Sequence, residues 1–365
     1  MRIREVHLQD FRNIPLAHVE LGTSDAFFLG KNAQGKTSFL EACGLLTALR
    51  SFRTSDLRHL IRDEGSGEAR LRFVLDHESR GECEIEVVIK KTGRELYVDG
   101  ERVRRQQDFV GQYPVVPICS DDIELLRGAP GARRRFLDLL LAGTGDGYFE
   151  ALRAYTRVLK DRNALLKKGR GGLELAAFDL PLAQAGAILV ATRIDAVDTL
   201  NRDLQDLYQA YSPADETVEV RYQASIESTD KVEYREALSK GLKRDMALGS
   251  TLSGPHRDDL QFFMGGRKAR DYGSEGQQRG YVLALKLAAV LRFRRILGAT
   301  PVVLADDVLL ELDEERRRLF WNTLDEDIQV IASGTQKPLG GRKGEWQFWD
   351  VKAGLFNSGK NGDGA

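Results

Sequence analysis

The chain has 365 residues, 42% of them hydrophobic, so it is long and apolar enough to form one large elaborated domain or two domains rather than a disordered chain. Its 54 Lys and Arg residues balance 55 Asp and Glu residues, which removes global basic charge as a sign of nucleic-acid binding but leaves local clusters open. The cysteines Cys43, Cys83 and Cys119 lie far apart without a Cys-x-x-Cys pair, which argues against a zinc site or a disulfide framework and favours a reducing compartment.

The start of the chain, Met1-Arg2-Ile3-Arg4-Glu5, lacks the apolar core of a signal peptide. No apolar run is expected to approach the length of a membrane span. We therefore expect a cytoplasmic protein without a membrane partner.

Residues 2–29 show the apolar spacing of strands, and they lead directly into a glycine loop. An apolar helical segment with Leu40, Cys43, Leu46 and Leu49 follows that loop. Glycines let a loop wrap closely around a polyphosphate, while backbone N–H groups, a lysine and a hydroxyl bind the phosphates and Mg²⁺. The pattern predicts nucleotide binding, with a chance glycine loop as the alternative. The predicted binding stretch is Gly30-Lys31-Asn32-Ala33-Gln34-Gly35-Lys36-Thr37-Ser38.

Three alternating runs follow the first helix, at 71–75, 85–89 and 96–98. The turns at 91–94 and 98–101 are typical of hairpins, so the runs predict an antiparallel sheet. A short buried strand is expected at 115–118.

From about Phe136 the pattern becomes helical, with one helix at 148–167 and another that includes Ile188 to Tyr211. We interpret this as a helical lobe inserted into a nucleotide-binding domain. The expected organisation is residues 1–135 and 246–355 as the two parts of an ATPase head, 136–245 as the lobe, and 356–365 as a flexible tail.

An apolar run, 301–305, ends in the carboxylates Asp306 and Asp307. At the end of a buried parallel strand, Asp306 is expected to hold Mg²⁺ opposite Thr37, and Asp307 to orient or deprotonate an attacking water. A solvated turn would be the better interpretation in isolation, but the phosphate loop in the same chain favours the site.

A third motif begins at Ser274, where a hydroxyl, Gly276 and Gln277 stand at the start of a helix that reaches about Leu297. Such a helix start can bind an anion. Since one nucleotide does not need two such sites in one chain, we expect this one to cap the γ-phosphate bound by another copy. The alternative is an ordinary N-capped helix.

Basic residues gather in three segments that are candidates for DNA backbone contacts, with solvated surface as the alternative for each. They are Arg50, Arg53, Arg58 and Arg62; Arg102, Arg104 and Arg105; and Lys160, Lys167, Lys168 and Arg170. Arg12 is placed either near the nucleotide or in a surface ion pair. His256 is interpreted as part of a hydrogen-bonded structural corner rather than as a catalytic group.

The order and spacing of these motifs resemble the SMC-like ABC ATPases, and several local motifs resemble the RecF family among them. The motifs that carry the resemblance are the loop at 30–37, Phe11-Arg12-Asn13, Leu40-Glu41-Ala42, Arg50-Ser51-Phe52-Arg53, Gly128-x-Pro130, Arg133 to Asp138, Arg162-Asn163-x-Leu165-Leu166, Ser253 to Leu260, Gly276-Gln277-Gln278-Arg279 and Asp306-Asp307-Val308-Leu309.

The resemblance implies an α/β fold: an ABC-type P-loop ATPase head with an antiparallel β subdomain and an inserted helical arm. It also implies ATP and Mg²⁺ as cofactors, ATP-dependent homodimerisation, and binding to single-stranded and gapped double-stranded DNA. Further implications are a slow DNA-stimulated ATPase and action with RecO and RecR in loading RecA during DNA replication, repair and the SOS response. On this view Lys36 and Asp307 are catalytic.

Some positions depart from the family pattern. Leu310 stands where a serine is usual at the dimer interface, and Ser120 stands where a proline is usual. The switch histidine of transporter ATPases has no counterpart, and Thr335 is expected to sense the γ-phosphate instead. No Q-loop glutamine can be assigned.

Two other classes of protein would carry different motifs. A transporter-type ATPase subunit would have a shorter segment between the phosphate loop and the Ser274 motif, and it would carry the switch histidine. A GTP switch would carry an Asn-Lys-x-Asp motif, which this chain lacks.

Overall fold

The computed structural model describes residues 1–54, 56–144, 147–169, 173–211, 216–308, 312–338 and 346–359. Within it the chain forms two compact units. The first unit consists of Met1–Asp122 and Val282–Ala365, and the second of Ile123–Tyr281. Arg170, a candidate for DNA contact, and Leu310, a departure from the family pattern, lie outside the described residues.

The first unit contains an antiparallel sheet with the strand order β2-β1-β4-β5-β6-β7. Three of its strands coincide with the alternating runs expected from the sequence, and both expected hairpins are present. The strands are β1 (Arg2–Phe11), β2 (Ile14–Glu20), β4 (Glu68–His77), β5 (Gly81–Lys90), β6 (Gly93–Val98) and β7 (Glu101–Arg102).

A second sheet of the first unit has the order β15-β14-β3-β13-β12-β8, and all its neighbours are parallel except the pair β14 and β15. The expected buried strands at 115–118 and 301–305 are both in it. Its strands are β3 (Ala26–Leu29), β8 (Val115–Cys119), β12 (Val302–Asp306), β13 (Val330–Gly334), β14 (Gln347–Lys352) and β15 (Leu355–Ser358).

One hydrophobic core joins the two sheets through helix α1 (Lys36–Ala48). Alternate side chains of β4, such as Leu71 and Phe73, point into this core, which explains why a period of two is visible in the sequence. α1 is apolar nearly all round and packs on β8, β12 and β13. The first unit also contains short 3-10 helices at Leu57–Leu60 and Gln106–Asp108, and helix α10 (Glu314–Thr323).

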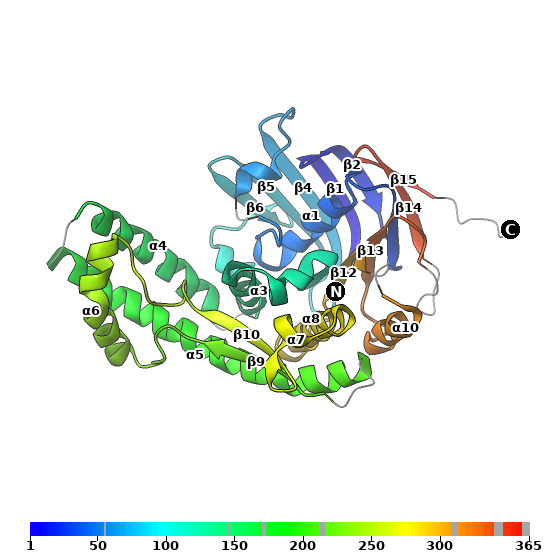
Figure 1. Cartoon of the computed structure of the whole chain (residues 1–365). Coiled ribbons are helices and arrows are strands. Elements are labelled where there is room, and N and C mark those ends of the chain that lie inside the picture. The colour runs from blue at the N-terminus through cyan, green and yellow to red at the C-terminus, as the bar shows by residue number, and fades with distance from the viewer. Residues whose placement is uncertain are drawn as a thin grey trace. The chain divides into compact units, whose positions relative to one another are not determined.

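The second unit is built around three long helices that lie side by side (Figure 1). They are α4 (Tyr148–Lys167), α5 (Leu173–Tyr211) and α6 (Lys231–Leu248). A small sheet in the order β11-β10-β9 packs along α5. Its strands are β9 (Val218–Gln223), β10 (Asp259–Met264) and β11 (Arg267–Lys268), and the shorter helices are α2 (Glu124–Arg127), α3 (Pro130–Ala142) and α7 (Ala269–Tyr272).

The second unit extends beyond the helical lobe expected at 136–245. It includes α3, which packs on β10, and the β9–β10 ribbon, whose second strand begins only at Asp259. These contacts link segments far apart in the chain, so helical periodicity alone does not reveal them. Helix α8 (Glu275–Leu297) starts in the second unit and continues into the residues of the first.

The start of the expected tail, 356–365, is ordered within the described residues. Residues 355–358 form β15, and the Phe356 ring contacts the rings of Phe28 and Phe39 at centroid distances of 5.8 and 5.2 Å. This apolar contact anchors a segment whose small polar neighbours predicted fraying.

Among the described residues, one helix is long and apolar enough to cross a membrane by length and composition, the part of α5 from Glu174 to Ala210. The expectation that no apolar run approaches such a length is therefore wrong. Half of its most apolar stretch is buried inside the structure, as in the core helices of many proteins, and α5 also carries the buried, ion-paired Arg193. Length and composition alone are weak evidence for a span.

Candidate functional site

The predicted phosphate loop joins β3, which ends at Leu29, to α1, which begins at Lys36. The Lys36 ammonium is almost fully buried and donates hydrogen bonds to the carbonyl oxygens of Gly30, at 2.8 Å, and Lys31, at 3.1 Å. Gly35 has φ 113°, a backbone conformation that residues other than glycine rarely adopt. The loop thus curls around its own lysine, which places a positive charge where a polyphosphate would bind.

The carboxylate Asp306 ends β12 in the interior of the parallel sheet, between β13 and β8. Its Oδ1 accepts a hydrogen bond from the Thr37 hydroxyl at 3.1 Å and another from the Ser333 hydroxyl at 2.7 Å. Thr37 and Asp306 were expected to share a metal ion, and the structure brings their oxygens together.

Burial is the largest influence on Asp306, and it raises the pKa of this carboxyl. The hydrogen bonds from Ser333 and Thr37 act in the opposite direction, and the nearby charge of Asp307 raises the pKa further. A buried carboxylate beside a second one is costly unless a cation neutralises it.

Asp307 follows directly, with φ 56°, an uncommon conformation for a residue other than glycine. Its backbone N–H donates to the Ser333 hydroxyl at 3.2 Å. Its Oδ1 is buried and accepts no hydrogen bond from the part of the chain that the structure describes. A strained residue with an unsatisfied buried oxygen is typical of a functional site.

These groups fit Mg²⁺, which binds carboxylate and hydroxyl oxygens and keeps several waters. Thr37 and Asp306 supply the protein oxygens, and Asp307 supplies an acceptor for a water. The roles assigned to these residues remain predictions.

A buried carboxylate that the sequence analysis named only within the motif Leu40-Glu41-Ala42, without a role, lies next to this site. Glu41 of α1 is fully buried, and its carboxylate accepts hydrogen bonds from Arg12 at 2.6 and 2.9 Å, from Arg53 at 3.3 Å, and from the Ser51 hydroxyl. Its place as the single acid of α1, among the apolar residues from Phe39 to Leu46, was the available signal.

The two arginines bound to Glu41 bear on earlier expectations. Arg12 makes an ion pair, as one of its two alternatives predicted, although its partner is buried rather than on the surface. Arg53, assigned above to a DNA surface, is half exposed, and its charge partly offsets the rise in the pKa of Asp306 that burial causes. Arg53 therefore acts electrostatically on the predicted metal site.

The Ser274 motif opens α8 in the second unit with a capping box. The Ser274 hydroxyl accepts from the backbone N–H of Gln277 at 3.3 Å, and Gln277 Oε1 accepts from the backbone N–H of Ser274 at 2.7 Å. Gln277 Nε2 also donates to Glu216 at 2.9 Å. Within one chain, Ser274, Gly276 and Gln277 thus form an N-capped helix start, and their anion-binding role in a second copy remains a prediction.

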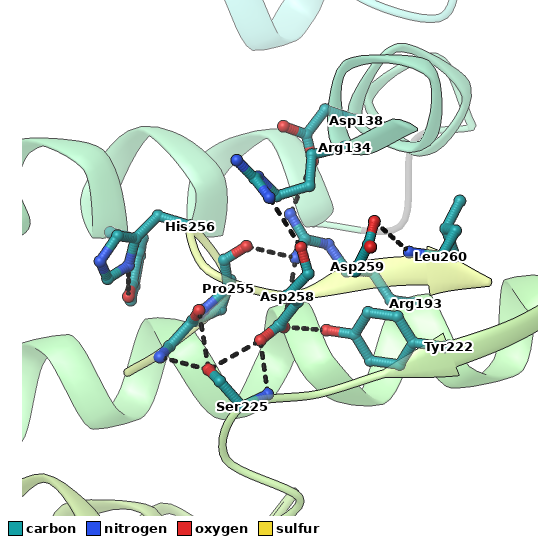
Figure 2. A network of polar contacts seen from close by, with 12 residues as sticks. Arg134, Asp138, Arg193, Tyr222, Ser225, Pro255, His256, Asp258, Asp259 and Leu260 are labelled. Carbon is teal, nitrogen blue, oxygen red and sulfur yellow. Dashed lines mark hydrogen bonds and ion pairs between the residues drawn. The ribbon is translucent and has the colours of Figure 1, made fainter. Parts of the chain in front are cut away.

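The corner formed by residues 253–260 is held by a network of polar contacts centred on Asp258 (Figure 2). The Asp258 carboxylate is buried and accepts hydrogen bonds from the backbone and hydroxyl of Ser225, at 2.7 and 2.9 Å, and from the Tyr222 hydroxyl. Arg193 lies 3.4 Å from it and also binds Asp138 at 2.8 Å. The network ties α3 and α5 to the β9–β10 ribbon.

His256 lies at the same corner. Its Nδ1 is 2.8 Å from the Tyr155 hydroxyl and its Nε2 is 3.0 Å from the Thr251 carbonyl oxygen, and burial lowers its pKa. Gly254 has φ 128°, and a Cβ there would lie 2.1 Å from the Tyr155 hydroxyl. This is the geometry of a structural corner.

The basic candidates for DNA contact differ in their surroundings. Arg58 and Arg62 form ion pairs with Asp56 and Glu64. Arg58 is exposed although it is paired, and Arg102 lies 3.7 Å from Glu95. The other exposed residues of the clusters are Arg50, Arg53, Arg104, Arg105, Lys160, Lys167 and Lys168. The first two clusters belong to the first unit and the third belongs to the second.

Comparisons with known proteins agree with this architecture. The family model described as RecF/RecN/SMC N terminal domain matches residues 2–339. "DNA replication and repair protein RecF" of Synechococcus sp. (strain JA-3-3Ab) is 35% identical over 364 residues, covering 95% of this chain and 94% of that protein. The protein of the same name from Geobacter sp. (strain M21) is 37% identical, covering 92% of this chain and 93% of that protein.

Solved structures show the same fold. The structure described as "recombination mediator protein RecF-ATP in RecFOR pathway" has a TM-score of 0.88 and 28% identity, covering 98% of this chain and 97% of that chain. An Smc head domain derived from Pyrococcus furiosus has a TM-score of 0.54 at 14% identity, covering 97% of this chain and 94% of that chain, and supports the fold alone. The expected fold class, an ABC-type ATPase head with an antiparallel subdomain and a helical arm, is thereby confirmed. The chain belongs to the RecF family of the SMC-like ABC ATPases.

Proposed function

We propose that this protein is an ATP-dependent, DNA-binding recombination mediator of the cytoplasm. It dimerises on ATP, binds single-stranded and gapped double-stranded DNA, and acts with RecO and RecR to promote RecA loading in replication, repair and the SOS response. Its ATPase is slow and sets the time of release from DNA. The names of its relatives, "DNA replication and repair protein RecF", support this assignment.

The observation that carries the proposal is the convergence of Lys36, Thr37 and Asp306, together with the unsatisfied buried oxygen of Asp307. In this assignment Lys36 binds the β- and γ-phosphates, and the backbone of the loop from Gly30 to Ser38 surrounds them. Thr37 and Asp306 hold Mg²⁺, which supplies charge neutralisation on the phosphates. A solved RecF structure described as an ATP complex supports ATP as the nucleotide.

Asp307 orients a water and accepts its proton. Its short side chain must reach the water from a strained backbone, which is consistent with slow turnover. The rate of hydrolysis then determines how long the protein stays bound to DNA.

Dimerisation places the Ser274 motif of one copy on the γ-phosphate held by the other. The start of α8 carries the positive end of the helix dipole, and Gln277 must release the Ser274 N–H for a phosphate oxygen to accept from it. The nucleotide thus joins two copies.

Sedimentation velocity with Asp307→Asn tests the dimer. With ATP and Mg²⁺ this variant should become dimeric, and with ADP it should stay monomeric. Ser274→Arg should stay monomeric with ATP. Asp230→Ala is the control because it removes an N-cap of α6 in the same unit and should leave dimerisation intact. An ATP-bound monomer, or a Ser274→Arg dimer, contradicts the proposal.

DNA binding is tested by ATP turnover with and without gapped DNA, over a range of salt concentrations. Gapped DNA should raise turnover, and affinity should fall steeply with salt because the contacts are to phosphates. A rate that is unchanged by DNA removes the support for a mediator.

A further inference from the structure

The turn between β14 and β15 lies against the predicted phosphate loop, more than 300 residues away in the chain. The backbone N–H of Ala353 donates to Gln34 Oε1 at 2.7 Å, and the N–H of Gly354 donates to the Gln34 carbonyl oxygen at 2.8 Å. One residue of the loop therefore accepts two hydrogen bonds from consecutive residues of the turn.

The two segments lie close together. A Cβ at Gly30 of the loop would lie 2.4 Å from the Val351 carbonyl oxygen of β14, and a Cβ at Gly35 would lie 3.4 Å from the Cα of Gly354 in the turn. Ala353 has φ 51° and Gly354 has φ 76°, the left-handed pair of a two-residue hairpin turn between β14 and β15. Both N–H groups of this turn donate to Gln34, so the turn makes a specific contact with the loop.

Asn13 supports the loop from a second side. Its amide donates to the Ala33 carbonyl oxygen at 3.1 Å, and its Oδ1 accepts from the Ser38 hydroxyl at 2.7 Å. Ala33 has φ 63°. The left-handed part of the loop is thus held between Asn13 and the turn.

The turn can serve as a support because its own hairpin is anchored. β14 pairs in parallel with β3, the strand that leads into the loop, and Phe356 of β15 packs against Phe28 and Phe39. Phe28 and Phe39 flank the loop on β3 and α1. Any displacement of the hairpin is therefore transmitted to the loop.

We infer that the Ala353–Gly354 turn is a positioning element for the phosphate loop, and that Gln34 is a positioning residue acting through this turn rather than a ligand of the nucleotide. The inference rests on the proposed binding of ATP by this loop. It assigns the C-terminal hairpin a part in nucleotide affinity, which depends on the loop being held in its binding shape before ATP arrives.

Amide hydrogen exchange on the nucleotide-free protein is the first test. Gln34→Ala should raise exchange at Ala353 and Gly354, and in the loop at 31–35, by roughly 3- to 10-fold, the value of one net hydrogen bond. Gln34→Glu keeps an acceptor for the Ala353 N–H and should restore protection of the turn. Gln347→Ala is the matched control, because Gln347 donates to the Glu20 carbonyl oxygen from the same hairpin without touching the loop.

Titration with a fluorescent ATP analogue and Mg²⁺ is the second test. Gln34→Ala should raise Kd roughly 3- to 10-fold, and Gln347→Ala should leave it unchanged. Gly354→Ala should weaken binding from the hairpin side, because its Cβ would lie 2.5 Å from the Asn13 carbonyl oxygen and displace the turn. Combining it with Gln34→Ala should add little, because both changes separate the turn from the loop. Thermal unfolding without nucleotide shows whether Gly354→Ala folds, and if it does not, the exchange data on Gln34→Ala decide.

Failure of this inference is distinguishable from failure of the proposed function. If the wild type binds ATP and Gln34→Ala binds it equally well with unchanged exchange in the turn, the positioning role is refuted while ATP binding stands. If the wild type binds no ATP, the proposed function is refuted, and the exchange comparison still shows whether Gln34 holds the turn to the loop.

Discussion

The Thr37 hydroxyl donates a hydrogen bond to Oδ1 of Asp306 at 3.1 Å, although 269 residues separate them in the chain. The contact joins the start of α1 to the end of β12. It assembles the two oxygen groups expected around a metal ion before any nucleotide binds, so less of the site has to be ordered on binding.

Asp306→Asn should make the nucleotide-free protein more stable. It should also abolish the gain in thermal stability that ATP and Mg²⁺ give the wild type. Since burial raises the pKa of Asp306 above its unfolded value, the folded state binds its proton more tightly than the unfolded state does. The stability from this group is present at low pH and is lost as pH rises through the folded pKa. At neutral pH the neutral amide removes the destabilisation caused by the buried negative charge of Asp306. Each kcal/mol of unfolding free energy gained should raise Tm by roughly 2–4 °C.

Differential scanning fluorimetry with and without ATP and Mg²⁺ measures both effects. Asp350→Asn, in an exposed part of β14, is the control and should change neither. An Asp306→Asn protein that is less stable without nucleotide, or that still gains stability from ATP, would contradict the prediction.

Glu41→Ala should destabilise the first unit by about 2–4 kcal/mol, because it leaves Arg12 partly buried without its partner. Glu64→Ala is the comparison. Glu64 pairs with Arg62 but is 85% exposed, so its loss should cost less than about 1 kcal/mol. Urea unfolding followed by tryptophan fluorescence measures the two, and similar costs would show that the Glu41 cluster is not a structural anchor.

Asp258→Asn should cost about 3–5 kcal/mol, since it leaves the buried Arg193 with one carboxylate fewer and places an amide donor among donors. Tyr222→Phe removes a single hydroxyl from the same carboxylate and should cost only about 1 kcal/mol. Denaturant unfolding monitored by circular dichroism ranks them. A Tyr222→Phe cost equal to that of Asp258→Asn would overturn the central place of the carboxylate in this network.

Because of His256, the free energy of unfolding should decrease as the pH falls below 6.5. Burial lowers its pKa below the ordinary 6.5, while the Thr251 carbonyl, Arg257, Asp258 and Arg134 modify the shift. The unfolded state therefore binds the proton more tightly, and stability present above pH 6.5 is lost as pH falls toward the folded pKa.

Urea midpoints at pH 7.5, 6.5 and 5.5 should fall less steeply for His256→Gln than for the wild type. His7, whose pKa is also lowered by burial, contributes with the same sign, so His7→Gln serves as a separate reference. Identical pH profiles for the wild type and His256→Gln would contradict the prediction.

Much of the fold could be predicted from local patterns. The alternation at 71–75 and 85–89 identified β4 and β5, the glycine turns identified the β5–β6 and β6–β7 hairpins, and the span 148–167 matched α4 residue for residue. These features depend on residues close together in the chain, where periodicity and turn chemistry act directly. The part of α5 that precedes Ile188 and the ordered strand β15 were not predicted, because packing against distant segments determines them.

The candidate site divides in the same way. The sequence by itself determined the phosphate loop, the paired carboxylates Asp306 and Asp307 and the capped start of α8, since each is a contiguous motif with its own chemistry. Only the tertiary structure revealed that Ser333 binds Asp306, that Glu41 unites Arg12 with Arg53, and that Gln34 faces Ala353. Those contacts join residues from different strands and helices, and only the folded arrangement of the sheet decides which of them meet.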